Sequence, residues 1–265
     1  MSKIIFSSLL LGLCLGHMAC QKVVKLDLRI PPPQYVIEGD ITDQPGPYTV
    51  RILQTTAFYD SNSFKGVTGA TVQVSDGQGS PEVLVYGGGG NYYTRQLQGT
   101  PGRTYTLSVL IGDSSFSATS TMPQHIPLDD IDIEQVQNSG KNVLVAVPVF
   151  VNPQGPGIAY YLFDQTINGV LDKTLYYWNS QYSQGLINTL DLERSDPDST
   201  LHSGDSVQIE MRCLDKPVYT YWSSLDAAAT GSGGSYPGNP VTNLTGGALG
   251  YFSAHTSQTK GIRVE

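Results

Sequence analysis

Histidines and cysteines are the residues of this sequence that could carry metal or nucleophilic chemistry. His125, His202 and His255 lie far apart, and none belongs to an H-x-x-x-H or H-E-x-x-H pattern, which would place two metal ligands on one face of a helix. Cys213 lies in the expected strand 207–214 with no histidine motif beside it, so we interpret it as a small buried apolar residue of that strand. The spacing therefore predicts no catalytic residue, no bound metal and a protein that is not an enzyme.

Two acidic segments, 129–134 and 196–205, could bind a cation. Aspartate and isoleucine alternate in the first segment, which is typical of a strand whose carboxylates face solvent. The second segment resembles a calcium loop in composition, but it lacks the D-x-D-x-D-G frame that ends in a glutamate. A solvated loop is the favoured interpretation of 196–205, and a calcium ion there is an open alternative.

Cys20 is the residue whose surroundings indicate a defined modification. The apolar run over 4–15 is typical of a signal peptide, because it is shorter than the ~20 residues that span a bilayer. Ala19 supplies the small residue that a lipoprotein peptidase requires before the cysteine, although His17 stands where an apolar residue is usual. We expect residues 1–19 to be removed and Cys20 to carry diacylglycerol and palmitate, with no other cofactor. An ordinary secretory signal cut elsewhere is the alternative.

The composition indicates a β protein and excludes several partners. Only 14% of the residues are charged and the net charge is −8, which argues against nucleic acid and against a polybasic contact with anionic lipid. The 265 residues include 29 glycines, 16 prolines and 16 tyrosines, as in turn-rich β structure. After cleavage only Cys20 and Cys213 remain, so we expect no disulfide framework.

We expect residues 20–33 to be the lipidated cysteine followed by a short tether. The three prolines at 31–33 favour an extended polyproline conformation in this tether. A first domain, 34–123, then shows short alternating segments separated by turns, and this spacing predicts an immunoglobulin-like or transthyretin-like β-sandwich. The expected strands are 35–41, 48–54, 70–74, 83–86, 92–97, 105–111 and 116–121.

A second β-rich domain, 124–265, is expected to contain one short helix. Pro217 can occupy the first position of that helix, and the next glycine, at 231, can end it. Between them, apolar residues recur at helical spacing: Val218, Tyr221, Trp222 and Leu225. The expected strands are 143–151, 158–167, 171–178, 207–214, 246–252 and 260–264, with a hairpin turn at Asn168-Gly169. The fold class is thus mainly all-β with two domains.

Aromatic residues are the feature of the second domain that could bind a partner. Tyrosine and tryptophan are dense between 160 and 182, and exposed rings stack on sugars and anchor protein interfaces. Neighbours in a strand point to opposite faces, so the alternative is that at least half of these rings are core. The candidate binding residues are Tyr176, Tyr177, Trp178, Tyr182 and, in the glycine-rich loop 231–241, Tyr236.

Ordered blocks at both ends of the chain resemble a known family. The opening block is YVIEGDITD with GPYTV at 35–50, and GRTYTL follows at 102–107. The block NPVTN at 239–243 precedes GGALGYFSA at 246–254. These blocks resemble the Bacteroidota outer-membrane lipoproteins of domain of unknown function 4249. The resemblance implies a lipoprotein often encoded beside a TonB-dependent transporter, and it supplies no catalytic residue.

The leading hypothesis is a non-enzymatic outer-membrane lipoprotein that serves as an accessory or binding subunit of a TonB-dependent β-barrel transporter. The alternative is a glycan-binding or adhesin-like surface lipoprotein that acts without a transporter, and a peptide ligand is also open. A hydrolase with a dispersed site ranks third, because no nucleophile–base pair is recognisable. We expect the protein to be at the cell surface, with the periplasmic face as an alternative because residues 21–25 are basic and apolar.

Overall fold

The computed structural model describes residues 33–56, 64–138, 140–188, 190–196, 199–231 and 238–265. Cys20, the signal peptide, the tether up to residue 32 and Tyr236 lie outside the described residues. Residues 33–265 form one compact unit. The described chain is mainly β, as the sequence predicts, and it contains one helix.

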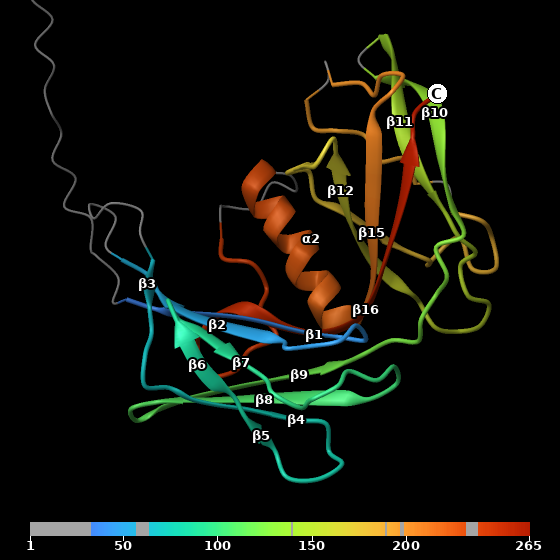
Figure 1. Ribbon diagram of the computed structural model, residues 1–265. Coiled ribbons are helices and arrows are strands. Elements are labelled where there is room, and N and C mark those ends of the chain that lie inside the picture. Colours follow the sequence, from blue (N-terminus) through green and yellow to red (C-terminus); the bar gives the residue numbers. More distant parts are fainter. Residues whose placement is uncertain (1–32, 57–63, 139, 189, 197–198, 232–237) are drawn as a thin grey trace, which may run out of the picture. The chain divides into compact units, whose positions relative to one another are not determined.

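A β-sandwich occupies the first part of the chain (Figure 1). Its two sheets enclose one hydrophobic core, because inward side chains alternate with outward ones along each strand. Ile37 and Ile41 are fully buried in this core, whereas Glu38 and Asp40 face the other way. One sheet contains β1 (Tyr35–Thr42), β2 (Thr49–Gln54), β3 (Lys65–Gly66), β6 (Val85–Gly88), β7 (Asn91–Tyr93) and the start of β16 (Leu249–Arg263). The other contains β4 (Thr71–Ser75), β5 (Glu82–Val83), β8 (Thr104–Ile111) and β9 (Ser114–Thr121).

The segment 83–86, expected as one strand, is divided between the two sheets. Glu82–Val83 pairs with β4 of one sheet, and Val85–Gly88 pairs with β7 of the other. Leu84 lies between them with 6% of its surface exposed and packs in the sandwich core. The chain therefore crosses the edge of the sandwich at a buried leucine, which alternation of apolar residues cannot distinguish from a continuous strand.

The last strand, β16, joins the two parts of the fold. The sequence predicts separate strands at 246–252 and 260–264, and this prediction is wrong because Leu249–Arg263 is continuous. Its first half pairs in parallel with β1, from Leu249 opposite Val36 to His255 opposite Thr42. Its second half pairs antiparallel with β15 (Ser206–Leu214). The sandwich thus takes a strand from beyond residue 124, and the expected division into two domains stays a prediction.

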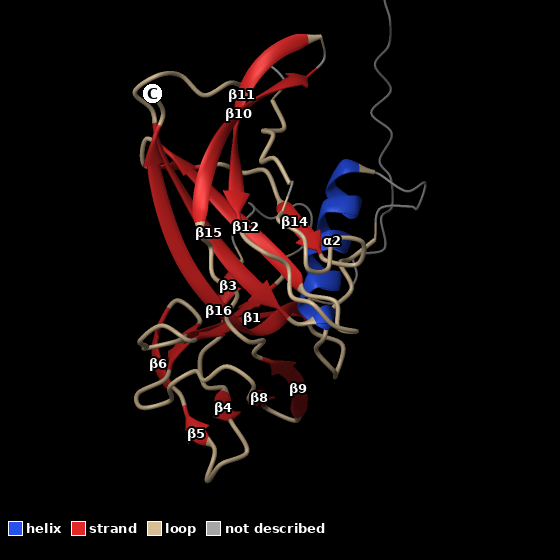
Figure 2. Cartoon of the chain, turned by 90° about the vertical axis from the view of Figure 1, so that its right-hand side faces the viewer, coloured by secondary structure: helices blue, strands red, loops and turns tan. Residues whose placement is uncertain are grey.

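The remaining strands build a layered second part (Figures 1 and 2). Its central strands are β12 (Tyr160–Ile167), β15 and β16. Two short strands, β13 (Val170–Leu171) and β14 (Tyr176–Asn179), both pair with β12. The hairpin of β10 (Asp130–Asn138) and β11 (Lys141–Val149) covers one face. Asn168 and Gly169, with φ of 52° and 79°, form the tight turn that their sequence predicts. Cys213 is buried in β15, so its predicted role is confirmed.

The opposite face is covered by α2 (Lys216–Thr230), which confirms the predicted helix. Asp215 caps its first turn by accepting the Val218 N–H bond at 3.1 Å, and Gly231 ends it with φ of 68°. Val218 and Tyr221 are buried, and Trp222 packs against the sheet. The helix therefore uses its apolar stripe for packing.

Candidate functional site

The aromatic candidates of β14 are distributed over two faces of the sheet. Tyr176 and Trp178 pack on the side of the β10–β11 hairpin, and Tyr177 packs toward α2. The Tyr176 hydroxyl donates to Asp172 at 3.1 Å and accepts from Gln165 at 3.3 Å, so both its ring and its hydroxyl are engaged. The strand alternation thus separates three rings that are adjacent in the sequence.

Tyr177 belongs to a group of rings that hold α2 against the sheet. Its hydroxyl donates to Asp226 at 3.1 Å, and its ring meets Tyr219 with centroids 5.8 Å apart. Trp222 and Tyr251 make a similar contact at 5.2 Å. Aromatic pairs with offset or edge-on rings contribute stability beyond the burial of their apolar area, so these contacts stabilise the packing of the helix on the sheet.

Tyr182 differs from the other candidates because 90% of its surface is exposed. It lies past the end of β14, where the strand alternation no longer determines its direction. Four aliphatic side chains of nearby chain segments are also exposed, and we call them, with Tyr182, the apolar loop surface. They are Val151 (51% exposed), Ile158 (38%), Leu186 (60%) and Ile187 (60%).

The apolar loop surface has a fixed backbone. Its two segments, 150–159 and 180–188, are joined by bonds from Asn152 N to Leu186 O at 2.9 Å and from Gly185 N to Asn152 O at 3.0 Å. The side chain of Asn152 is fully buried and accepts a bond from the Tyr161 hydroxyl at 3.1 Å. Every residue of both segments is uncharged. The two segments therefore present uncharged, partly apolar side chains on a preorganised backbone, in which Val151 and Ile187 are bridge partners.

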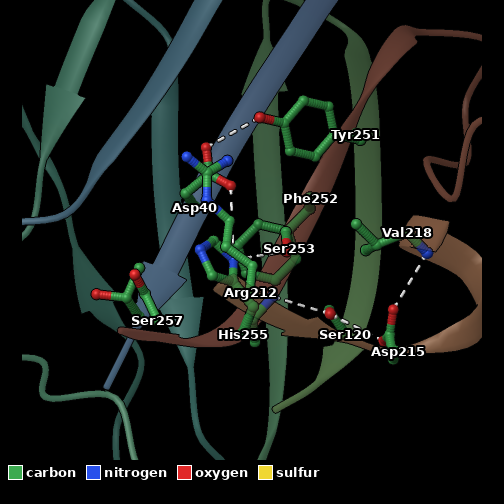
Figure 3. A network of polar contacts seen from close by, with 12 residues as sticks. Asp40, Ser120, Arg212, Asp215, Val218, Tyr251, Phe252, Ser253, His255 and Ser257 are labelled. Carbon is green, nitrogen blue, oxygen red and sulfur yellow. Dashed lines mark hydrogen bonds and ion pairs between the residues drawn. The ribbon is translucent and has the colours of Figure 1, made fainter. Parts of the chain in front are cut away.

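A second constellation, the polar junction, lies where β1, β12, β15 and β16 meet (Figure 3). Arg212 lies between Asp164, at 2.5 Å, and Glu210, at 2.9 Å. The hydroxyl of Ser257 donates to Glu210 at 2.6 Å. Burial alone would raise the pKa of Glu210, but the bond and charge of Arg212 hold that pKa below its usual range. The pKa of Asp164 is raised, mainly by burial.

Asp40 and His255 form the other half of the polar junction. The Tyr251 hydroxyl donates to Asp40 Oδ2 at 3.0 Å, and Asp40 Oδ1 lies 3.8 Å from Nδ1 of His255. The Asp40 side chain is 42% exposed, yet desolvation by the surrounding strands raises its pKa to about 6. His255 is 4% exposed, and its burial and the nearby Arg212 charge lower its pKa to about 3. His255 is therefore neutral at physiological pH.

Ser253, His255 and Asp40 are the residue types of a catalytic triad, but their geometry differs from one. Ser253 Oγ lies 2.8 Å from His255 Nδ1, and the nearest Asp40 oxygen approaches the same nitrogen. In a triad the serine and the aspartate contact opposite ring nitrogens, so that the imidazole can relay a proton. Ser253 is also 1% exposed. We interpret the group as a structural junction.

Sequence reasoning did not identify the polar junction. Its residues come from strands that are distant in the chain, and a sequence does not state which strands pair. A signal was present, because Asp164, Glu210 and Arg212 are charged residues within the expected strands 158–167 and 207–214. His125 and His202 are exposed and lie in other parts of the fold.

The described ranges also bear on metal binding and on membrane insertion. No group of three or more His, Cys, Asp or Glu residues in those ranges is placed to hold a metal ion. The calcium alternative at 196–205 includes residues 197 and 198, which lie outside the described residues. Within the described chain, no helix combines the length and the apolar character needed to cross a bilayer.

Protonation of His255 predicts a specific acid sensitivity. Because the folded-state pKa is about 3 and the free value is 6.5, the unfolded chain binds a proton between these limits that the folded chain does not. His255 by itself should therefore lower the stability as the pH drops below 6.5, by about 2 kcal/mol at pH 5. Asp40 acts in the opposite direction and offsets part of this loss in the wild-type protein, since its raised pKa favours folding as the pH falls from about 6 toward 3.8.

Urea unfolding at pH 7 and pH 5 measures this effect. The His255→Gln variant should lose the acid-sensitive component, and Asp40→Asn should increase the sensitivity. His202→Gln is the matched control, because the His202 side chain is 75% exposed. An unchanged pH dependence in His255→Gln would contradict the assignment.

The geometry defines a mostly β protein with a neutral apolar loop surface and a partly buried polar junction. The chain matches the family profile described as Domain of unknown function (DUF4249) over residues 22–261. It therefore belongs to this family, which confirms the resemblance seen in the sequence blocks. No curated protein matches the chain significantly.

Proposed function

We propose that this protein is a non-enzymatic, lipid-anchored outer-membrane lipoprotein that serves as an accessory or binding subunit of a TonB-dependent transporter. The apolar loop surface is the observation that supports this proposal. Tyr182, Leu186 and Ile187 expose more than half of their surface on a hydrogen-bonded backbone. Exposed apolar groups of this kind are typical of protein interfaces, and a fixed backbone lowers the entropy cost of binding.

The character of the surface favours a neutral protein partner. A charged partner would find no ion-pairing side chain in 150–159 or 180–188 and would lose hydration without compensation. An extracellular or periplasmic loop of a β-barrel with exposed apolar side chains would bury Leu186 and Ile187. Tyr182 supplies an aromatic anchor, the type of residue that carries much of the energy in such interfaces.

Purification of the tagged lipoprotein in mild detergent tests the proposal. The wild-type protein should recover a large β-barrel partner, and the double variant Leu186→Asp/Ile187→Asp should recover at least about tenfold less, because buried carboxylates remain unpaired. The matched control is Val170→Asp/Leu171→Asp, since these residues are 70% and 56% exposed on the β12–β13 hairpin. Repeated recovery of the lipoprotein alone, or equal recovery with both double variants, would contradict the proposal.

A further inference from the structure

An open depression of about 370 Å³ lies on the outer face of the sheet that contains β4, β8 and β9. Exposed residues alternate with buried core residues along these strands. The exposed residues face away from the sandwich core, so they can line the depression while their neighbours fill the core. Five of the lining residues carry hydroxyl groups: Thr71, Ser108, Ser115, Ser117 and Thr245. The depression is therefore rich in groups that both donate and accept hydrogen bonds.

The rim of this depression is held in place. Thr245 N donates to Ser117 O at 2.8 Å, and the two hydroxyls lie 2.8 Å apart. Gly246 follows with φ of 81°, and a Cβ at this position would lie 2.4 Å from Ser115 O. Because only glycine permits this approach, the 245–246 segment lies directly on β9 and the depression exists before any ligand binds.

The remaining lining residues specify the chemistry of a ligand. Gln73 and Ser108 are cross-strand partners, so an amide and a hydroxyl lie side by side. Leu110, 48% exposed, adds an apolar surface beside them. All nine residues that line the depression are uncharged. A charged ligand would be desolvated there without a counter-charge, whereas a neutral polyhydroxylated ligand finds matching donors and acceptors.

We propose that this depression binds a neutral carbohydrate. The Gln73 amide can contact two adjacent sugar hydroxyls, and the hydroxyls of Thr71, Ser108 and Ser115 can serve the remainder, because those of Ser117 and Thr245 bond to each other. Leu110 would cover the C–H face of the sugar ring, where most of the apolar contact forms. This site is separate from the aromatic residues 176–182 that suggested glycan binding in the sequence, and it does not depend on the proposed transporter partner.

Binding to defined oligosaccharides tests this site. The full-length lipoprotein is titrated calorimetrically in an amine-oxide detergent, which has no sugar headgroup, with maltohexaose, cellohexaose, mannohexaose and xylohexaose. At least one should bind with a Kd of about 1 mM or tighter. An acidic oligogalacturonate of similar length should bind at least about tenfold more weakly. Absence of binding by all four neutral sugars at about 10 mM, or preference for the acidic one, overturns the proposal.

Charge insertion locates the binding. Ser108→Lys and Thr71→Lys each place a cation in the lining and should weaken binding at least about tenfold. Thr104→Lys is the control, because Thr104 is exposed on the same strand and face but lies outside the lining. The two test positions lie on different strands, so a folding defect in one leaves the other informative. Equal weakening by Thr104→Lys, or unchanged binding in the folded test variants, would overturn the proposal.

Discussion

The variant Gly250→Ala is expected to unfold with a free energy about 4 kcal/mol or more below that of the wild-type protein. Gly250 has φ of 97°, a backbone region that side chains other than glycine rarely adopt. A Cβ there would lie 2.1 Å from the carbonyl oxygen of Ile37, its partner in the parallel β1–β16 pairing. Backbone cannot rotate away as a side chain can, so β1 would have to separate from β16.

Gly247→Ala is the matched control for this prediction. Gly247 has φ of 82°, but a Cβ there would meet no atom within 4 Å. Its replacement should cost only the backbone strain, about 1–2 kcal/mol. The free energies of unfolding of the two variants in urea separate the cost of backbone strain, which both share, from the cost of the steric clash with Ile37, which only Gly250→Ala has. Equal losses would show that the close approach of β1 to β16 does not constrain the fold.

The variant Asp215→Ala should lose about 2–4 kcal/mol of stability. Asp215 caps α2 through the Val218 N–H, and its other carboxylate oxygen accepts bonds from Ser120 Oγ at 2.8 Å and Thr121 N at 2.9 Å. Ser120 Oγ in turn accepts the N–H of Ala254 in β16 at 2.9 Å (Figure 3). One carboxylate thus links the helix, β9 and β16, and its removal leaves two part-buried donors, Ser120 Oγ and Val218 N, without their acceptor.

Chemical denaturation again provides the measurement, with two comparison variants. Asp215→Asn keeps one acceptor oxygen and should lose less stability than Asp215→Ala. Asp226→Ala, in the same helix, removes the hydrogen bond from Tyr177 and should cost about 1 kcal/mol. A loss below about 1 kcal/mol in Asp215→Ala would mean that the helix cap is replaced by water or by another side chain.

Local patterns were sufficient where one segment determines its own structure. The Asn168-Gly169 turn follows from two residues that tolerate positive φ, and α2 follows from Pro217 and its apolar stripe. Pairing between distant segments was not accessible. Leu249–Arg263 pairs with β1 in its first half and with β15 in its second, and each half alone has the pattern of an ordinary short strand.

The candidate sites likewise combine features that a local pattern predicts with features that depend on how distant segments pack. Alternation along β14 indicated that some aromatic residues would be core, but the partner of each face depended on where α2 and the β10–β11 hairpin pack. Leu186 and Ile187 were missed because apolar residues usually indicate core, and only the three-dimensional structure shows them exposed. Asp40 and Arg212 lie on strands that β16 separates, and the Arg212 charge still acts across it to lower the pKa of Asp40, which burial raises, a relation that no local pattern encodes.

Site-specific photo-crosslinking in intact cells tests the proposed docking role most directly. A photoreactive amino acid replaces Ile187 in the apolar loop surface, and a second variant carries it at Val170, which is 70% exposed on the β12–β13 hairpin. We expect one discrete high-mass adduct that contains a β-barrel protein from position 187, and none from position 170. No adduct from position 187, or the same adducts from both positions, would contradict it.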